Sequence, residues 1–189
     1  MNADTAVLEK AQEKAQTMGR TLANMLVFLS AFTVLGLLYL LTCMFMLLVT
    51  PELMTTLDYT PLAGFMPLSK ARLLATPEIV SAIAVHLFTL GIVLAILLLA
   101  ASLFRGIVRD NRPFGKPQSR LLRWMGTLML IIFCGRTVLI FLIGLLLSPD
   151  IPLDNTFILI TLVLGLLFYC LSYIFEYGHV LQVESDETL

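Results

Sequence analysis

One arginine lies in the middle of a long apolar stretch, where a charged side chain is unusual. Arg136 interrupts the run 124–148 and is twelve residues from each of its ends. A charge at that depth in a bilayer costs several kcal/mol unless it is hydrogen-bonded. No Asp or Glu occurs at this depth in the other apolar runs, so its acceptors are backbone carbonyls or neutral side chains: Tyr39, Thr42, Thr161 and Tyr169. Two alternatives follow: structural hydrogen bonding between helices, or a site for an anion or a lipid headgroup.

His86 is the second ionisable side chain inside an apolar run, about two turns into the run 79–104. Its depth differs from that of Arg136 by roughly 8 Å, because a helix rises 1.5 Å per residue. A long arginine side chain could reach toward it. Arg136 and His86 are therefore the candidate intramembrane polar site. A hydrogen-bonded packing role for the histidine is the simpler alternative to a proton switch or a ligand.

The sequence lacks the usual motifs of catalysis and metal binding. It contains no Ser–His–Asp grouping, no HExxH, no P-loop and no paired carboxylates inside an apolar run. One histidine without a nearby carboxylate does not make a metal site. We therefore expect a non-enzymatic protein with no catalytic residue, no cofactor and no metal.

The apolar runs around these residues define the elements that must position them. Hydrophobic types make up 59% of the 189 residues and charged types only 13%, which is more apolar than ordinary soluble domains are. Four runs are long enough to cross a hydrocarbon layer of about 30 Å as helices, namely 22–49, 79–104, 124–148 and 157–175. Continuous runs contradict the alternating pattern of a membrane β-barrel. The predicted fold is one all-α domain, an integral membrane four-helix bundle.

Basic residues are distributed unequally between the two ends of these predicted helices. Nine lie in the N-terminal segment and the loop 105–123, whereas the outer loop 50–78 has two and the loop 149–156 has none. Since basic residues favour the cytoplasmic side, the prediction is N-in and C-in. Four aromatic residues have the positions of an interfacial belt: Trp124, Tyr169, Tyr173 and Tyr177. A net charge of −1 excludes a globally basic nucleic-acid binder, so we expect no direct nucleic-acid partner.

Helical periodicity begins before the first apolar run. Apolar residues recur on one helical face at Val7, Leu8, Ala11, Ala15, Met18 and Leu22. This pattern predicts an amphipathic cytoplasmic extension of the first helix. The extension either packs on its own protein as a solvated helix end, or binds lipid or a partner helix. The apolar, proline-containing loop 50–78 is expected to fold back on the outer helix ends, as a structural lid or a ligand-access cap.

Two predicted cytoplasmic segments have opposite charges. The basic loop 105–123 has a net charge of +5 and the acidic tail 176–189 a net charge of −4. We expect the tail to fold onto the loop until a partner displaces it; the alternative is a loop lying on anionic headgroups. Prolines predict a turn over 110–117, and Gly178 is expected to end the fourth helix. The candidate partner or lipid face comprises Arg109, Arg112, Pro113, Phe114, Lys116, Arg120, Arg123, Glu176, Tyr177, Gly178, Glu184, Asp186 and Glu187.

Two motifs on this face resemble those of a bacterial membrane family catalogued as domain of unknown function 2975. The motif that runs from Arg112-Pro113-Phe114 to Arg120-Leu121-Leu122-Arg123-Trp124-Met125-Gly126 is similar to the family's loop signature, with Gln118 where Asn is usual. The ending Phe175-Glu176-Tyr177-Gly178, followed by Leu181-Gln182, Glu184 and 186–189, is similar to its C-terminal pattern. The resemblance implies a four-helix protein of the bacterial inner membrane. It also implies a gene often placed beside that of a small helix-turn-helix regulator, and it transfers no catalytic residues.

Two functional hypotheses follow. The first is a non-enzymatic regulatory or signalling protein of the bacterial inner membrane. It would bind a cytoplasmic partner, such as a small helix-turn-helix transcription regulator, through the basic loop and the acidic tail. The second is a small transporter, or an anion- or lipid-binding membrane protein, with its site at Arg136 and His86. Membrane lipid is a partner in both, and a homo-oligomer stays open.

Overall fold

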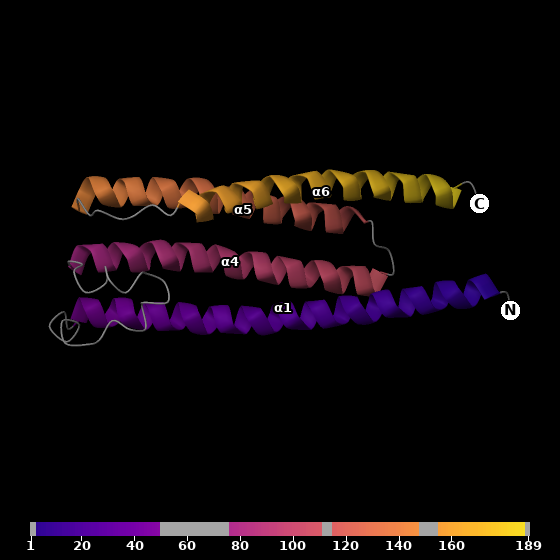
Figure 1. Cartoon of the computed structure of the whole chain (residues 1–189), viewed down its shortest axis with the longest axis horizontal. Coiled ribbons are helices and arrows are strands. Elements are labelled where there is room, and N and C mark those ends of the chain that lie inside the picture. Colours follow the sequence, from indigo (N-terminus) through magenta and orange to yellow (C-terminus); the bar gives the residue numbers. More distant parts are fainter. Residues whose placement is uncertain (1–2, 50–75, 111–114, 148–154, 188–189) are drawn as a thin grey trace.

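The computed structural model of the chain describes residues 3–49, 76–110, 115–147 and 155–187. They form four helices, α1 (Ala3–Val49), α4 (Thr76–Asp110), α5 (Lys116–Leu147) and α6 (Asn155–Glu187), and the described ranges contain no strand (Figure 1). Each helix includes a stretch long and apolar enough to cross a membrane. The prediction of an all-α bundle with four membrane spans is confirmed.

The helices carry many of their large apolar side chains on the outside. Phe141, Leu145 and Leu146 are 69%, 73% and 79% exposed, whereas the small polar residues Ser81 and Ser172 are buried. In water such a surface would be penalised by about 25 cal/mol per Å², but in hydrocarbon it is not. Membrane helices instead associate through close packing of small residues and through hydrogen bonds. The chain is therefore a multi-pass membrane protein.

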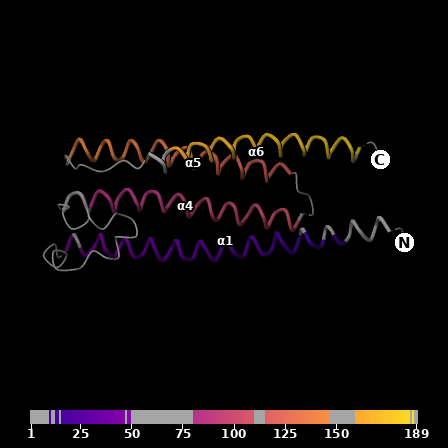
Figure 2. The backbone as a smooth tube through the Cα atoms, in the orientation of Figure 1, coloured from indigo at the N-terminus to yellow at the C-terminus, as the bar shows by residue number. Residues whose placement is uncertain are grey.

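Helices that are consecutive in the chain are neighbours in space. α4 packs against both α1 and α5, and α6 packs against α5, each helix running antiparallel to the one before it (Figures 1 and 2). Leu40 of α1 and Ile83 of α4 form one buried core cluster. A second cluster joins α4 to α5 through Ile96, Met125 and Ile132. The interior is thus a series of pairwise helix contacts.

One end of the bundle holds the start of α1, the end of α4, the start of α5 and the end of α6 (Figure 1); we call it the terminal end. About 20 residues suffice to cross the hydrocarbon layer, but α1 has 47 and α6 has 33. At the terminal end, α1 and α6 run past the neighbouring ends of α4 and α5 (Figure 1). The predicted helical extension of the first span is confirmed as part of α1.

Two glycines allow α5 and α6 to approach closely. A Cβ atom on Gly126 would lie 2.8 Å from Cδ2 of Tyr169 and 3.1 Å from the backbone oxygen of Gly165. Both distances are shorter than an ordinary van der Waals contact, so glycine fits where a larger residue would push the helices apart. Small residues serve this purpose widely in membrane proteins. This crossing helps to set which side chains of α5 and α6 face each other toward the terminal end.

The helices extend beyond the charged residues that bounded the predicted spans. The apolar stretches within them are Gln16–Met46, Val80–Arg109, Lys116–Leu146 and Leu159–Ser185. The prediction that Gly178 ends the fourth helix is wrong, because α6 continues to Glu187. One glycine inside a helix costs only about 1 kcal/mol relative to alanine, which the neighbouring turns offset.

The predicted turn over 110–117 is also too long. Lys116 and Pro117 belong to the first turn of α5, where a proline is tolerated because its missing N–H is not needed. At the other end of the bundle, residues 76–78 open α4 and are not part of the predicted outer loop. The rest of that loop, 50–75, lies outside the described residues, as do Arg112, Pro113 and Phe114.

Candidate functional site

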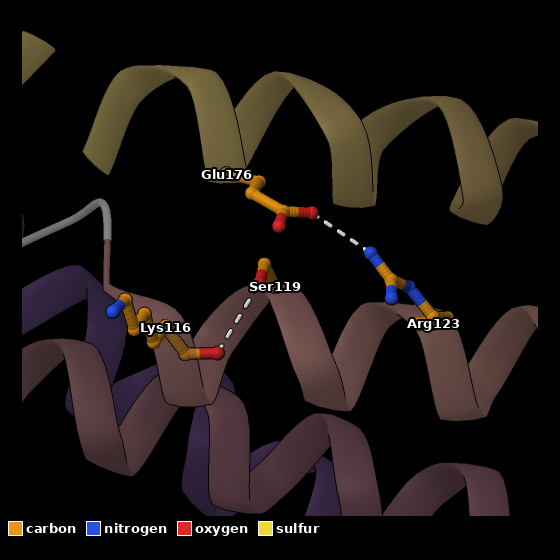
Figure 3. Close-up of polar contacts among 4 residues, drawn as sticks. All are labelled: Lys116, Ser119, Arg123 and Glu176. Atoms are coloured by element: carbon orange, nitrogen blue, oxygen red, sulfur yellow. Dashed lines mark hydrogen bonds and ion pairs between the residues drawn. The ribbon is translucent and has the colours of Figure 1, made fainter. Parts of the chain in front are cut away.

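An ion pair joins α5 to α6 at the terminal end. Nη2 of Arg123 donates a hydrogen bond of 2.8 Å to Oε2 of Glu176 (Figure 3). The two side chains are 46% and 54% exposed, and exposed ion pairs contribute about 0–1 kcal/mol. The pair therefore orients the two helix surfaces more than it stabilises the fold. It connects the basic segment to the acidic one, as expected from their opposite charges.

Further contacts continue this α5–α6 seam. The guanidinium carbon of Arg123 lies 5.5 Å from the centre of the Tyr173 ring, within the range of a cation–π interaction. Deeper in the bundle, the hydroxyls of Thr127 and Tyr169 are hydrogen-bonded at 2.7 Å. Residues three or four positions apart share a helix face, which explains why 123 and 127 face 169, 173 and 176. Of the three predicted belt tyrosines, Tyr169 is part-buried within the seam, whereas Tyr173 and Tyr177 are exposed.

The first turn of α5 is held by hydrogen bonds to its own backbone, and one amide side chain is buried beside it. The backbone N–H groups of Gln118 and Ser119 donate to the carbonyl oxygen of Gly115, and the Ser119 hydroxyl donates to the carbonyl oxygen of Lys116 at 3.1 Å (Figure 3). Gln118 is 2% exposed and its side chain lies against Gly106 of α4 and Gly115. This arrangement fixes where the basic residues of α5 begin.

A groove of about 570 Å³ lies between these ends of α5 and α6. Its lining combines basic, acidic, aromatic and hydroxyl groups, from Lys116, Ser119, Arg120, Arg123, Trp124, Thr127, Tyr169, Glu176, His179 and Val180. A second groove of about 530 Å³ borders α4, with Leu99, Lys116, Pro117, Arg120, Leu121 and Trp124 along it. Lys116, Arg120 and Trp124 therefore separate two grooves. The combination can bind an anionic group at the polar side and an apolar group beside it.

The last turns of α6 carry a third, apolar groove. Residues 177–187 of α6, which we call the α6 tail, run on past the start of α5 (Figure 1). The groove has a volume of about 400 Å³ and is lined by Ile174, Tyr177, Gly178, Leu181, Gln182 and Ser185. Glu184 and Glu187 are exposed on the same tail. The tail does not fold back as predicted, because the helix continues to Glu187, although His179 and Val180 line the same groove as Lys116 and Arg120.

Arg136 and His86 lie apart from these three grooves. Both are partly buried, and the Nδ1–H of His86 donates to the carbonyl oxygen of Ala82 at 2.8 Å, a contact within its own helix. A Cβ atom on Gly135 would lie 2.6 Å from Cζ of Phe88. Arg136 and His86, which are one and two residues from these positions, are therefore at closely similar depths, and the predicted difference of roughly 8 Å is too large. Neither residue lines any of the three grooves.

One predicted acceptor of Arg136, Tyr169, lies elsewhere in the bundle. Tyr169 bonds Thr127, which precedes Arg136 by nine residues and is therefore about 13 Å away along α5. The Thr42 hydroxyl donates to the carbonyl oxygen of Leu38, and Thr161 is buried. Tyr169 therefore belongs to the α5–α6 seam and not to the depth of Arg136.

Only part of the predicted partner face comes together. Lys116, Arg120, Arg123 and Glu176 line one groove, whereas Tyr177 and Gly178 line the groove of the α6 tail. Arg109 is exposed on α4, and Asp186 lies in the α6 helix. Thr127, Tyr169 and His179 were not predicted as part of this face. Their positions could have indicated it, because Thr127 is four residues from Arg123 on α5, and His179 and Tyr169 are three and seven residues from Glu176 on α6. Within the four described segments, no three His, Cys, Asp or Glu residues are grouped to hold a metal ion.

Comparison of the chain with protein-family models, curated proteins and solved structures finds no match.

Proposed function

We propose that this multi-pass membrane protein is a non-enzymatic regulatory protein that binds a cytoplasmic partner at its terminal end. The observation that supports this most strongly is the α6 tail, a helix that projects past α5 while exposing both apolar and acidic side chains. Val180, Leu181 and Val183 are 48%, 46% and 39% exposed, and Glu184 and Glu187 are exposed beside them. An apolar surface with a charged rim is typical of a protein interaction site.

The depth of the tail supports its contact with water. The charged pair of Arg123 and Glu176 fits the edge of the hydrocarbon layer, because charges inside that layer are costly. Glu187 is eleven residues further along α6, which corresponds to about 16 Å. The headgroup region is only about 5–8 Å thick on each side. The end of the tail therefore reaches beyond the headgroups, where its exposed apolar residues favour coverage by another protein.

The chemistry of the tail indicates what kind of partner would fit. Its acidic residues favour a basic rim, and its apolar groove favours an inserted aliphatic or aromatic side chain, as in the docking of a helix into a groove. A small helix-turn-helix regulator, the partner implied by the resemblance to the family of unknown function, has the required basic surface. We infer that the terminal end faces the cytoplasm of a bacterial inner membrane, because the sequence has nine basic residues in the N-terminal segment and the predicted loop 105–123 but only two in the predicted loop 50–78.

A matched pair of charge reversals tests the proposal. Glu187→Lys changes the α6 tail, and Glu13→Lys makes the same change on the projecting part of α1; both glutamates are exposed. We expect a cytoplasmic protein that copurifies with the wild-type chain in mild detergent to be lost with Glu187→Lys and kept with Glu13→Lys. Equal retention by both variants, or equal loss from both, contradicts a role of the tail in docking.

A further inference from the structure

Three residues form an exposed stripe along the first turns of α5. Lys116, Arg120 and Trp124 are spaced by four residues, so their side chains lie on one face of the helix. All three are exposed, and Trp124 is 52% exposed. We call them the α5 stripe. The stripe borders both grooves of the α5 end, one toward α6 and the other toward α4.

The two positive charges of the stripe are not neutralised within the described helices. Glu176, the acidic residue of the adjoining groove, is paired with Arg123. Across the ranges that the structure describes, no carboxylate is paired with Lys116 or Arg120; the bond recorded at Lys116 uses its backbone oxygen. Two like charges about 6 Å apart along a helix repel each other. An anion bound between them would remove that repulsion.

The depth of the stripe corresponds to the headgroup layer. Tryptophan favours the boundary between hydrocarbon and headgroups. From Trp124, Arg120 lies about 6 Å outward and Lys116 about 12 Å outward along α5, and the headgroup region is about 5–8 Å thick. A phosphate of the surrounding lipid would therefore lie at the level of Arg120, and Lys116 would reach it from the water side.

The groove toward α4 continues the site into the apolar layer. Leu99, Leu121 and Trp124 line it together with the two basic residues. This arrangement places an apolar channel below a pair of cations. A small soluble anion would use only the cations, whereas an amphiphile would use both parts.

We propose that the α5 stripe binds the phosphate of an anionic phospholipid, with the glycerol and upper acyl chain in the groove of Leu99, Leu121 and Trp124. Arg120 and Lys116 hold the phosphate by charge-assisted hydrogen bonds. The groove that takes the lipid is on the α4 side of the stripe and shares no residue with the apolar groove of the α6 tail, so the proposal does not depend on the proposed function. Lipid binding at the α5 stripe holds α5 at one depth in the membrane. The end of the α6 tail stays available for a protein partner.

The single tryptophan of the chain reports on this site. Bromine on an acyl chain quenches tryptophan fluorescence on contact, so the protein is placed in phosphatidylcholine vesicles containing brominated phosphatidylglycerol. We expect half-maximal quenching at a clearly lower mole fraction of brominated phosphatidylglycerol than of brominated phosphatidylcholine. Equal mole fractions for the two lipids overturn the proposal, and this comparison requires no variant.

Matched double variants separate a local site from general surface charge. Lys116→Gln with Arg120→Gln removes the charges of the stripe. Arg20→Gln with Arg105→Gln removes two exposed arginines from α1 and α4 at the same end. Because the first pair of changes removes the charge-assisted hydrogen bonds to the phosphate, it should weaken the preference for phosphatidylglycerol by at least about tenfold, whereas the second pair should leave it within about twofold because it touches no part of the site. Equal losses from both double variants overturn a local site, as does no loss from the first.

Soluble glycerol phosphate and inorganic phosphate identify the source of the anion. Neither should reverse quenching by brominated phosphatidylglycerol at millimolar concentration, because neither fills the apolar groove. Reversal by either one shows that the stripe binds a soluble phosphate compound and overturns the assignment to lipid. If the stripe variant does not fold, Lys116→Arg with Arg120→Lys replaces it; we expect that variant to keep the preference, and a folded variant without it overturns the proposal.

Discussion

Arg123 of α5 and Glu176 of α6 form a 2.8 Å ion pair although 53 residues separate them in the chain. The pair lies where α5 begins and α6 leaves the bundle, so it divides the terminal end into two surfaces. On one side are the cations of the α5 stripe, Lys116 and Arg120. On the other is the α6 tail with its exposed apolar and acidic residues. The proposed lipid and protein sites use these two surfaces separately.

The α5–α6 crossing should be sensitive to a single methyl group. A Cβ on Gly126 would lie 3.1 Å from the backbone oxygen of Gly165, so Gly126→Ala is expected to destabilise the fold by about 1–3 kcal/mol, as overpacking does. The control is Gly144→Ala on the same helix, where nothing lies within 4 Å of the added atom. Unfolding in mixed micelles measures both variants. Equal stabilities would contradict the close crossing.

The hydrogen bond between Thr127 and Tyr169 should have a small, measurable effect. Tyr169→Phe removes this 2.7 Å bond and is expected to lower the free energy of unfolding by about 0.6 kcal/mol, the average found for bonds between membrane helices. Tyr177→Phe serves as the control, because Tyr177 is 66% exposed. Adding Thr127→Val to Tyr169→Phe should cost little more, since it then removes only the bond that the Thr127 hydroxyl donates to the Arg123 carbonyl oxygen within its own helix. A large additional loss would show that they act independently.

Replacement of the intramembrane arginine distinguishes the proposed function from a transport or anion site. Arg136→Leu removes a charge that costs about 3 kcal/mol at the centre of a span on insertion scales. We expect the variant to insert, to lose no more than about 1 kcal/mol of stability and to capture the cytoplasmic partner as the wild type does. A folded Arg136→Leu protein that no longer captures the partner would place the functional site inside the bundle.

The orientation of the bundle can be measured by cysteine labelling. The native Cys43, Cys134 and Cys170 lie within the apolar stretches of the helices, so they should react poorly with a membrane-impermeant maleimide. Glu187→Cys, beyond the apolar stretch of α6, is expected to be labelled only after the inner membrane is opened. Ser148→Cys, the residue that follows Leu147 in the sequence, should be labelled in cells with an intact inner membrane. The reverse result would put the terminal end outside.

The number and type of the elements could be predicted from the sequence, but their ends could not. Inside hydrocarbon every backbone polar group must be satisfied internally, so apolar runs of that length had to be helices. Charged residues such as Arg105 end an apolar run without ending a helix, because their side chains reach water while the backbone stays helical. Likewise Gly178 does not stop α6. Helix ends depend on packing and caps that hydropathy does not report.

The candidate site, too, could be predicted from the sequence only in part. The opposite charges of 105–123 and 176–189 predicted an attraction, and the structure has one in Arg123 and Glu176. Which arginine pairs with which glutamate could not be predicted, because it depends on the register set at the Gly126 crossing. For the same reason Tyr169 was predicted as an acceptor for Arg136 but bonds Thr127.

Photo-crosslinking in living cells tests the central claim most directly. A photoreactive amino acid replaces Leu181 in the groove of the α6 tail, and in a second variant it replaces Leu164, an exposed residue deep within the apolar stretch of α6. We expect one discrete protein adduct from position 181, lost when Glu187→Lys is added, and no such adduct from position 164. No adduct from position 181, or the same adduct from both positions, would contradict the account.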